Sequence, residues 1–599
     1  MDVDVQFHHG VVETPELIAA LASAAHLDPE LLETGGGKAR ITVQRRYLSE
    51  VAGLDQVKSI NQVHRVKLHN KVAREVLRLG EAVHPGPPDT KYEGQGEIVC
   101  VSDTGFDKGS RTPTKVRDAF KTSGTTPTVR VAALYALGRT DSSSDPDGHG
   151  THVCGSVLGD ETSAVTGERI QGAAPQATLV MQSLLSPNGG LGGIPRDLGK
   201  LFAEPYDKNH ARIHSNSWGS APDPFFQIEY NDESKAIDDF VDKHRDMVIL
   251  FAAGNDGMDT APRDGVVDRA QIGSQAAAKN CISVGASESL RPEINIKYSS
   301  FGYPKQPLGS DKVANDTRGM AAFSSRGPTR EGRIKPDVVA PGTCILSTLS
   351  SLATDTRDWG VSADPKFMYL GGTSMATPLV AGCCAVLRET LVKNGTLNPS
   401  AVLIKALLIN GAVELVGQYT PSEAGKSPND ASGWGRVDVA NSIVIPSGVA
   451  QDNGILTTAD GTAGFRDEAA PLDTFEEFVF AIPINGSGHT LKITLVWTDP
   501  AGAELQNDLD LIVVAPGDEI ERHGNQLAQE FSYKTKEQRD EEERATPSGG
   551  HASEPYDRKN NVEQVVWEGV PEGEAKVVVR GHNVSSLQGQ TFALVWRLY

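Results

Sequence analysis

The chain has 599 residues and a formal net charge of −21, and 38% of its residues are hydrophobic. A hydrophobic share of this size supports packed domains, and the length favours about four of them, with one fewer or one more also compatible. The acidic balance argues against a nucleic-acid backbone as the main partner. No run of 18 apolar residues occurs, so no membrane span is expected. The six cysteines form no CxxC pair, which favours buried free thiols over a zinc site or a disulfide scaffold.

Residues 1–69 are predicted to form a small α+β domain. Strand-like alternation occurs at residues 3–7, 39–44 and 60–68, and helical spacing occurs at residues 14–25 and 48–57. The first helix is expected to have Thr14 as its N-cap and Pro15 as its first residue. A linker rich in proline and glycine follows at residues 84–89.

Residues 70–445 are predicted to form a doubly wound α/β domain around a parallel sheet. Short apolar runs at residues 97–101, 178–181, 248–253 and 281–285 are typical of buried parallel strands, and helical patterns lie between them. Sites in such folds lie at the carboxyl edge of the sheet, so residues that directly follow these runs are the first candidates for chemistry.

Residues 446–599 are predicted to form an antiparallel β-sandwich or jelly roll. Their apolar and alternating segments are separated by turn residues, as in all-β domains. These segments are residues 475–482, 491–497, 509–514, 575–580 and 592–598. Within this region, residues 534–544 (KTKEQRDEEER) have no apolar stripe. We expect a solvated loop insertion there, with a partner-binding tail as the alternative.

Two motifs place reactive side chains at a strand end and at a helix start. Asp103 follows a buried strand in VCVSDTG, where it can belong to a site at the sheet edge or can cap the next turn. His149 and His152 begin a glycine-rich helix in DGHGTHVCG, and their spacing allows a metal pair or a single catalytic base. The HExxH zinc motif is missing from this stretch, and a buried structural role is expected for His152 rather than for His149.

Ser374 lies in GGTSMATP, at the start of a predicted helix of small residues. Free N–H groups and the dipole at a helix start favour developing negative charge, and an ordinary N-cap serine is the alternative. Residue 376 is alanine, so the GxSxG elbow of α/β-hydrolases is absent. Asn255 ends another buried strand in FAAGNDG, and its side-chain N–H is expected to face an oxyanion.

In chain order the reactive residues are Asp103, His149 and Ser374. An acyl-transfer triad needs a hydroxyl nucleophile, an imidazole that takes its proton and a carboxylate that orients the imidazole. The motifs VSDTG, GHGTHVCG, AAGND and GGTSMATP, in this order, resemble those of the subtilisin-like serine proteases, or subtilases. The resemblance implies that these three residues form the triad, that Asn255 is the side-chain oxyanion donor, and that catalysis needs no cofactor.

The resemblance also implies a binding cleft for polypeptide substrates. Residues 215–219 (SNSWG) resemble the strand that pairs with substrate on one side of the cleft, and residues 189–193 (GGLGG) resemble the strand on the other. Gln275 stands at the wall of the first specificity pocket, where many relatives have proline. The residues carried over as substrate-binding are Ser217, Trp218, Gly219, Gly189, Gly190, Ala252, Ala253 and Gly254.

Further segments resemble one subgroup, the oxidatively stable alkaline subtilases of bacilli, which carry a C-terminal β-sandwich. These segments are residues 133–139, 433–437, 495–499, 507–511 and 560–563. The resemblance implies that residues 1–69 are a propeptide of the β-α-β-β-α-β type, removed by a cut near His69–Asn70. It also implies structural Ca²⁺ in the sandwich, with Asp499, Asp508 and Asp510 as candidate ligands, whereas spacing alone favours solvated loop acids.

A function from another class is a catalytically silent protein that holds a polypeptide or a glycan on its sandwich. The presence of Asp103, His149, Ser374 and Asn255 weighs against this alternative. The family is mostly exported, whereas the polar, acidic start of this chain is unlike a secretory signal and free thiols favour a reducing compartment. Export and an intracellular location are therefore both left open.

Overall fold

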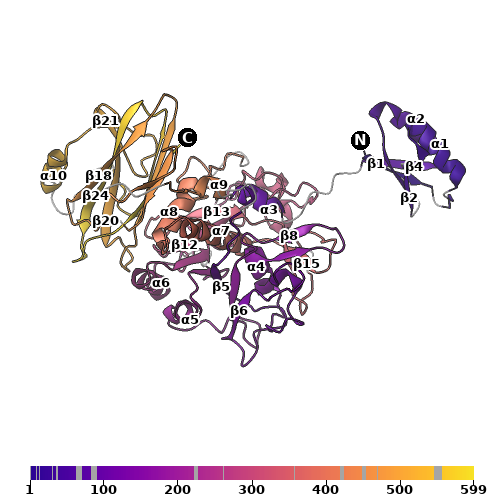
Figure 1. Ribbon diagram of the computed structural model, residues 1–599, viewed down its shortest axis with the longest axis horizontal. Helices are drawn as coiled ribbons and strands as arrows, with labels where there is room; N and C mark the ends of the chain where they lie inside the picture. Colours follow the sequence, from indigo (N-terminus) through magenta and orange to yellow (C-terminus); the bar gives the residue numbers. More distant parts are fainter. Residues whose placement is uncertain are drawn as a thin grey trace. The chain divides into compact units, whose positions relative to one another are not determined.

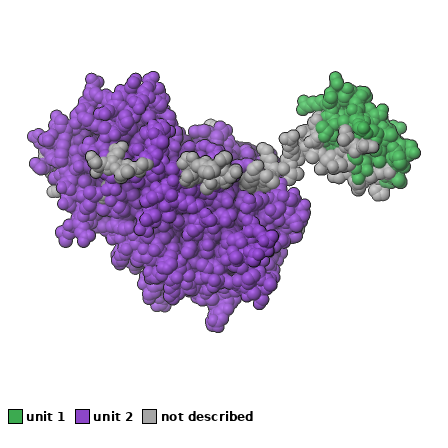
Figure 2. Space-filling model, in the orientation of Figure 1, with its two compact units in different colours: residues 1–68 green, residues 69–599 purple. Residues whose placement is uncertain are grey.

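The computed structural model describes residues 2–8, 10–12, 14–29, 32–35, 38–62, 71–82, 91–221, 227–260, 262–355, 358–417, 424–447, 453–468, 470–545 and 556–599. The chain divides into two compact units, Met1–Leu68 and His69–Tyr599 (Figure 2). The domain boundary predicted at residues 69–70 lies outside the described residues, and the one at residues 445–446 falls inside the second unit. Both boundaries stay predictions.

The first unit contains, over its described residues, a four-stranded antiparallel sheet of order β2-β3-β1-β4 and two α-helices. Thr14 accepts the N–H of Leu17 at 3.3 Å, and Pro15 is the first helical residue, as the sequence predicts. Val5, Leu21 and Ile41 belong to its buried core. In chain order the elements are β1 (Asp2–Phe7), α1 (Pro15–Ala25), β2 (Glu33–Gly35), β3 (Lys38–Thr42), α2 (Leu48–Ala52) and β4 (Val57–Gln62).

The second unit is built around a parallel sheet in which seven strands are described, in the order β13-β12-β11-β10-β5-β9-β6 (Figure 1). The predicted parallel α/β fold is confirmed. The strands are β5 (Ile98–Asp103), β6 (Val131–Ala136), β9 (Thr178–Ser183), β10 (Ile213–Asn216), β11 (Val248–Ala252), β12 (Ile282–Ser287) and β13 (Val338–Pro341). The longer helices are α4 (His149–Leu158), α5 (Gly199–Asn209), α6 (Asp232–Lys243), α7 (Thr373–Lys393) and α8 (Ala401–Gly411). Shorter elements are α3 (Lys71–Val76), β7 (Asp160–Thr162), β8 (Arg169–Gln171), β14 (Ile345–Thr348), β15 (Phe367–Leu370) and α9 (Val439–Ser442).

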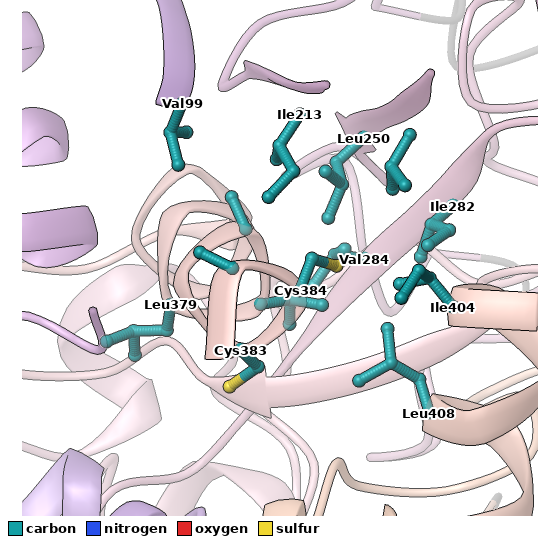
Figure 3. Packing of buried hydrophobic residues seen from close by; sticks show 14 of the residues in the cluster. Val99, Ile213, Leu250, Ile282, Val284, Leu379, Cys383, Cys384, Ile404 and Leu408 are labelled. Carbon is teal, nitrogen blue, oxygen red and sulfur yellow. The ribbon is translucent and has the colours of Figure 1, made fainter. Parts of the chain in front are cut away.

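Two neighbouring residues of β10 show that helices cover both faces of this sheet. Ile213 points toward α7 (Figure 3). Successive side chains of a strand point to opposite faces, and the ring of His214 meets Phe202 of α5 at a centroid distance of 4.9 Å. Burial lowers the pKa of His214 to about 3, so this histidine is a neutral core residue.

Helix α7 runs through the core on one side of the sheet. Its residues Leu379, Cys383 and Cys384 lie among apolar side chains such as Leu250 (Figure 3). By length and composition α7 is long enough and apolar enough to cross a membrane, and 94% of the apolar window is buried inside the protein. A helix that is apolar all round is expected in such a buried position. The six cysteines, all in described segments, are buried and free.

The C-terminal part of the second unit consists of antiparallel strands in two sheets of five, counted over the described residues. Their orders are β16-β17-β25-β19-β23 and β18-β24-β20-β21-β22, so the predicted β-sandwich is confirmed. The sandwich has a buried core of its own, which includes Trp497, Leu511 and Val577. Helix α8 packs on its strands β19 and β25. The strands are β16 (Leu456–Thr457), β17 (Ala463–Arg466), β18 (Glu477–Ile484), β19 (Thr490–Val496), β20 (Asn507–Val514), β21 (Ile520–His523), β22 (Phe531–Ser532), β23 (Val562–Glu568), β24 (Gly573–Val584) and β25 (Ala593–Leu598).

The charge run that was expected to be a solvated loop forms a helix, α10 (Lys536–Ala545). Arg539 is only 4% exposed and donates to Glu521 of β21 at 2.7 Å. Asp540 lies 2.8 Å from the guanidinium of Arg580 in β24. The prediction of a solvated loop was wrong because α10 forms ion pairs with strands β21 and β24 of the sandwich. These partners are distant in sequence, so the charge run alone does not reveal them.

Candidate active site

Asp103 is the last residue of β5 and His149 is the first residue of α4, so a strand end and a helix start bring them together. Asp103 Oδ1 lies 2.7 Å from His149 Nδ1 and also accepts the N–H of Thr104 at 2.7 Å. A carboxylate can only accept, so Nδ1 carries the hydrogen and Nε2 of a neutral His149 is an acceptor. A Cβ at Gly150 would lie 2.4 Å from the Gly105 carbonyl oxygen, so glycine permits this close approach.

The pKa of His149 depends on two opposing effects. Burial lowers it, but the charge of Asp103 and the hydrogen bond to Asp103 raise it, and Asp147 and Asp145 add to the rise. The result is a pKa of about 9, compared with an ordinary value of 6.5. A proton therefore stays on the imidazole up to alkaline pH in the free protein.

His152 has a different environment from that of His149. Its Nε2 lies 3.0 Å from the carbonyl oxygen of Ile345 in β14, and burial lowers its pKa to about 3. It is therefore a neutral, hydrogen-bonded core residue. The two histidines do not form a metal pair, because one faces a carboxylate and the other faces backbone carbonyls. Across the described residues, no group of three or more His, Cys, Asp or Glu is arranged to hold a metal ion.

Ser374 is the second residue of α7, which starts at Thr373 with Gly372 in the N-cap position. The alternative role as an N-cap serine therefore does not apply. Its Oγ donates to the carbonyl oxygen of Ser217 at 3.0 Å, and its own carbonyl accepts from Ser217 Oγ at 2.9 Å. The contacts of the described residues include no hydrogen bond between Ser374 and His149. Catalytic hydrogen bonds are often loose without substrate and tighten in the complex.

The orientation of Asn255 follows from its bonds to the start of α7. Its Oδ1 accepts the N–H of Thr373 at 2.8 Å and the hydroxyl of Thr373 at 3.0 Å. Only the oxygen of an amide can accept an N–H, so Nδ2 is turned away from Thr373. A Cβ at Gly372, whose φ is 149°, would lie 3.3 Å from Asn255 Nδ2 and 3.6 Å from the Ser374 nitrogen. The two N–H donors therefore border the same small space, which glycine leaves open.

A cavity of about 270 Å³ opens beside Ser374. Its lining also includes Ser220, Ala221 and Gly273, which the motifs did not indicate. Asp256 lines it as well and belongs to the AAGND motif, although no role was assigned to it. Buried Gln275 forms part of the wall, because its Oε1 accepts from Ser220 and its Nε2 donates to Glu233 at 2.6 Å. Eight residues expected to serve catalysis or substrate binding meet here, namely Ser217, Trp218, Gly219, Ala252, Ala253, Gly254, Asn255 and Ser374.

Comparison with known proteins agrees with this arrangement. The model of the Subtilase family, peptidase S8, matches residues 94–435, which is more than half of the chain and includes Asp103, His149, Asn255 and Ser374. The chain belongs to the subtilase family. A second cavity of about 350 Å³, beside Leu346 and Tyr369, contains none of the predicted catalytic residues of this subtilase.

Several curated relatives are named as proteases. The serine protease/ABC transporter B family protein tagD of Dictyostelium discoideum is 28% identical over 516 residues, which cover 71% of this chain and 28% of that protein. Serine protease AprX of Bacillus subtilis is 28% identical over 306 residues, covering 50% of this chain and 58% of AprX. Pyrolysin of Pyrococcus furiosus is 30% identical over 339 residues, covering 50% of this chain and 22% of pyrolysin. The matched part of this chain thus spans between 22% and 58% of the length of these relatives, which is less than two thirds in each case.

Gly189 and Gly190 do not line the cavity of the subtilase, and residues 189–193 do not form the expected strand. Gly190 instead closes a turn, in which its carbonyl oxygen accepts the N–H of Ser186 at 2.7 Å and the Ser186 hydroxyl at 2.8 Å. In this structure residues 189–193 are therefore an exposed glycine turn rather than a strand, and substrate binding by Gly189 and Gly190 stays a prediction.

The three predicted calcium ligands face cations of the protein. Asp499 pairs with the Lys279 ammonium, and its oxygens also accept backbone N–H groups of the 499–507 loop. Asp508 and Asp510 both pair with the Arg558 guanidinium. Asp499 therefore has a different cation partner from Asp508 and Asp510. Oδ1 of Asp508 and Oδ2 of Asp510 are buried and have no hydrogen-bond partner among the described residues, so they remain acceptors of the kind that Ca²⁺ uses. Calcium binding by this subtilase stays a prediction.

Proposed function

We propose that this subtilase is a serine endopeptidase that hydrolyses peptide bonds of polypeptides through an acyl-enzyme on Ser374. The observation that carries the proposal is the 2.7 Å contact between Asp103 and His149. Asp103 ends β5 next to the end of β10, at the same edge of the sheet as the cavity lined by Ser374 and Asn255. A carboxylate, an imidazole, a hydroxyl and two N–H donors are the parts that acyl transfer needs.

The first step begins when substrate binds along residues 215–219. A backbone N–H of an extended peptide donates a hydrogen bond to the carbonyl oxygen of Ser217. In the free protein this oxygen accepts a hydrogen bond from the Ser374 hydroxyl, which the substrate therefore displaces. The hydroxyl then turns to Nε2 of His149. Ser374 Oγ attacks the scissile carbonyl carbon while His149 takes the proton, and Asp103 stabilises the resulting imidazolium.

The negative charge that forms on the carbonyl oxygen is met by Nδ2 of Asn255 and the backbone N–H of Ser374. The N–H of Ser374 is among the first N–H groups of α7, which have no partner inside the helix. When the intermediate collapses, the C–N bond breaks and His149 gives its proton to the leaving amine. Water, deprotonated by His149, then hydrolyses the ester and restores the Ser374 hydroxyl.

The same proposal includes processing of the chain by itself near His69–Asn70. It is supported by the β-α-β-β-α-β order of elements in the first unit, which the resemblance associates with a propeptide. Residues 66–69, which are expected to occupy the acyl side of the cleft, lie outside the described residues. The first unit is then a polypeptide partner of the catalytic site.

Labelling with a fluorescent alkyl phosphonate tests the proposed activity, because such reagents react with an activated serine. We expect the wild type to be labelled and to cleave an internally quenched peptide, and the Ser374→Ala variant to do neither. The Ser585→Ala variant, altered in an exposed turn of the sandwich, serves as the matched control and should behave as the wild type. A folded wild type that neither reacts nor cleaves would overturn the proposal in favour of a silent binding protein.

A further inference from the structure

A buried carboxylate that takes no part in the proposed proton transfers lies close to the start of α4. Asp145 is fully buried, at 0% exposure, in the loop between β6 and α4, three residues before the N-cap Gly148. Its backbone N–H donates to the carbonyl oxygen of Asp107 at 2.8 Å, and its own carbonyl oxygen accepts from Ser350 Oγ at 2.6 Å. The backbone of Asp145 is therefore fixed by two neighbouring segments of the chain.

The side chain of Asp145 accepts four hydrogen bonds. Oδ1 accepts the hydroxyl of Thr104 at 2.8 Å and the N–H of Gly148 at 2.9 Å. Oδ2 accepts the N–H of Thr151 at 2.7 Å and its hydroxyl at 2.5 Å. Gly148 has no side chain with which to cap α4, so the carboxylate of Asp145 does the work of an N-cap from three residues away. Its negative charge is also favourable at a helix start.

Thr104 connects this carboxylate to the catalytic aspartate. Its N–H donates to Asp103 Oδ1 at 2.7 Å, and the same oxygen lies 2.7 Å from His149 Nδ1. Its hydroxyl donates to Asp145 and accepts the N–H of Gly150, the residue after the catalytic histidine, at 2.8 Å. One carboxylate and one hydroxyl thus join the end of β5 to the start of α4.

The backbone on both sides of the catalytic histidine is fixed by these bonds. Four consecutive N–H groups, those of residues 148–151, each donate to a side-chain oxygen. Two of them reach Asp145 directly, one reaches it through a hydroxyl, and that of His149 reaches Asp147. The imidazole is carried by this turn of backbone, so its 2.7 Å contact with Asp103 depends on the turn keeping its place.

We propose that Asp145 is a positioning residue for His149, whose carboxylate holds the first turn of α4 against the end of β5 and so sets the contact between His149 and Asp103. The inference deepens the proposed endopeptidase function, and its kinetic test rests on that function. Asp145 is not among the described residues that line the 270 Å³ cavity. Its removal should therefore affect the chemical step rather than the binding of substrate.

The charge of Asp145 acts on the imidazole as well as its hydrogen bonds. Burial lowers the pKa of His149, whereas Asp103, Asp147 and Asp145 raise it. His152 of the same helix also faces this imidazole and is neutral, because burial lowers its pKa to about 3. Neutralising Asp145 removes one of the three negative charges, so the imidazole should lose its proton at a lower pH.

Asp145→Asn is the decisive variant because it keeps the size of the side chain and changes its bonding. Each carboxylate oxygen accepts one backbone N–H, from Gly148 or from Thr151, so either orientation of an amide sets its NH₂ group against an N–H. We expect kcat on a quenched peptide to fall about ten- to a hundredfold, with KM within about twofold of the wild type. The pH at which kcat/KM reaches half its maximum should fall as well.

The low-field ¹H NMR resonance of the His149 Nδ1 proton provides a readout that does not depend on turnover. A strong hydrogen bond to a carboxylate moves such a proton to low field. Asp103→Ala removes the acceptor and should remove the resonance, which assigns it. We expect Asp145→Asn to remove or shift the resonance and Asp438→Asn to leave it unchanged. Asp438 is the matched control, because it is 3% exposed and caps α9 by accepting the N–H of Asn441 at 3.0 Å.

Thr104→Val tests the same network with a smaller change. It removes the hydroxyl bridge but keeps the bonds of Asp145 to the N–H groups of α4. We expect the same changes in kcat and in the resonance, to a smaller extent. The two substitutions act through one network, so the effect of the double variant should be less than the sum of the single effects. Urea unfolding of each variant measures its stability separately.

Two results would overturn the inference. One is an Asp145→Asn variant with the kcat, the pH profile and the resonance of the wild type. The other is a loss of activity that follows the loss of stability as it does in Asp438→Asn, with the resonance unchanged. If Asp145→Asn does not fold, Thr104→Val decides in the same way.

Failure of the proposed function gives a different result. A wild type without peptidase activity refutes that function, and the resonance then decides the inference alone. The inference stands if Asp145→Asn loses or shifts the resonance, and it is refuted if the resonance stays as in the wild type.

Discussion

Lys279 and Asp499 form an ion pair in which both side chains are fully buried, at 0% exposure. Lys279 lies just before β12 of the parallel sheet. Asp499 lies just after β19 of the sandwich, 220 residues further along the chain. The Lys279 ammonium also donates to the carbonyl oxygens of Pro500 at 2.8 Å and Glu504 at 3.0 Å. One lysine thus ties a sandwich loop to the parallel-sheet region, consistent with their forming a single compact unit.

Replacing Lys279 with methionine should destabilise the protein strongly. The Asp499 carboxylate would stay buried without its counter-ion, a loss of about 3–5 kcal/mol in the free energy of unfolding. Lys279→Met/Asp499→Asn should recover part of this loss, because the amide carries no charge. Lys208→Met is the control, since Lys208 is 68% exposed in its pair with Glu204 and an exposed ion pair contributes little to stability. Equal effects of the two lysine variants in urea unfolding would contradict this role.

Asn255→Ala should lower kcat more than it changes KM. The charge on the substrate oxygen exists only in the transition state, so losing the Nδ2 donor costs about 10²–10³ in kcat. That magnitude comes from removal of the oxyanion-hole asparagine of subtilisin, a member of the same family. Steady-state kinetics on a quenched peptide measure both constants. A raised KM with unchanged kcat would refute the assignment.

Activity should rise with pH into the alkaline range. His149 must be neutral to take the proton of Ser374, and its pKa in the free protein is about 9. The profile of kcat/KM against pH should therefore reach half its maximum near pH 9. This folded-state pKa lies above the ordinary value of 6.5, so protonated His149 stabilises the fold fully below about pH 6.5 and less as the pH rises through 9. A profile that is flat between pH 7 and 10 would contradict the geometry.

The Ser374→Ala variant should stay full-length, whereas the wild type should lose about 7 kDa, the share of the 63.8 kDa chain that 69 of its 599 residues represent. Intact-mass spectrometry and N-terminal sequencing read the cut directly. An intramolecular cut has a first-order rate that does not depend on protein concentration. The remaining body keeps its new N-terminal segment, because Arg74 donates to the carbonyl oxygens of Gly172 and Ala173 at 2.5 and 2.9 Å. A wild type that stays full-length and fully active would refute the assignment of residues 1–69 as a propeptide.

Hydrogen peroxide should reduce activity slowly and in part. Met375 follows Ser374 directly, and its sulfoxide would place a polar group beside the oxyanion donors. Only 1% of Met375 is exposed, so access of the oxidant is restricted. Activity followed during peroxide treatment, with Met375→Leu as the resistant control, tests this expectation. Rapid and complete inactivation would contradict both the burial and the resemblance to the oxidatively stable subgroup.

Local sequence determined the elements and the reactive residues of this protein. The apolar run that ends at Asp103 and the glycine-rich start of the helix at His149 are visible in single short segments, because strand burial and helix starts depend on neighbouring residues. The carboxyl ends of parallel strands meet at one edge of the sheet, so Asn255 could be placed near the other reactive residues. The alternating segments of the sandwich were equally local, and their strands match within a few residues.

Contacts between distant segments were decided only by tertiary structure. The sequence contains Trp359 and Gly371 but does not show that one covers the other, nor that Lys279 finds Asp499 across 220 residues. From the sequence alone Arg539 is expected to be a solvated charge, but in the fold α10 brings it beside Glu521 of β21. The physical reason is that burying a charge or a large ring is favourable only with a matching partner, and the partner is supplied by packing rather than by sequence neighbours.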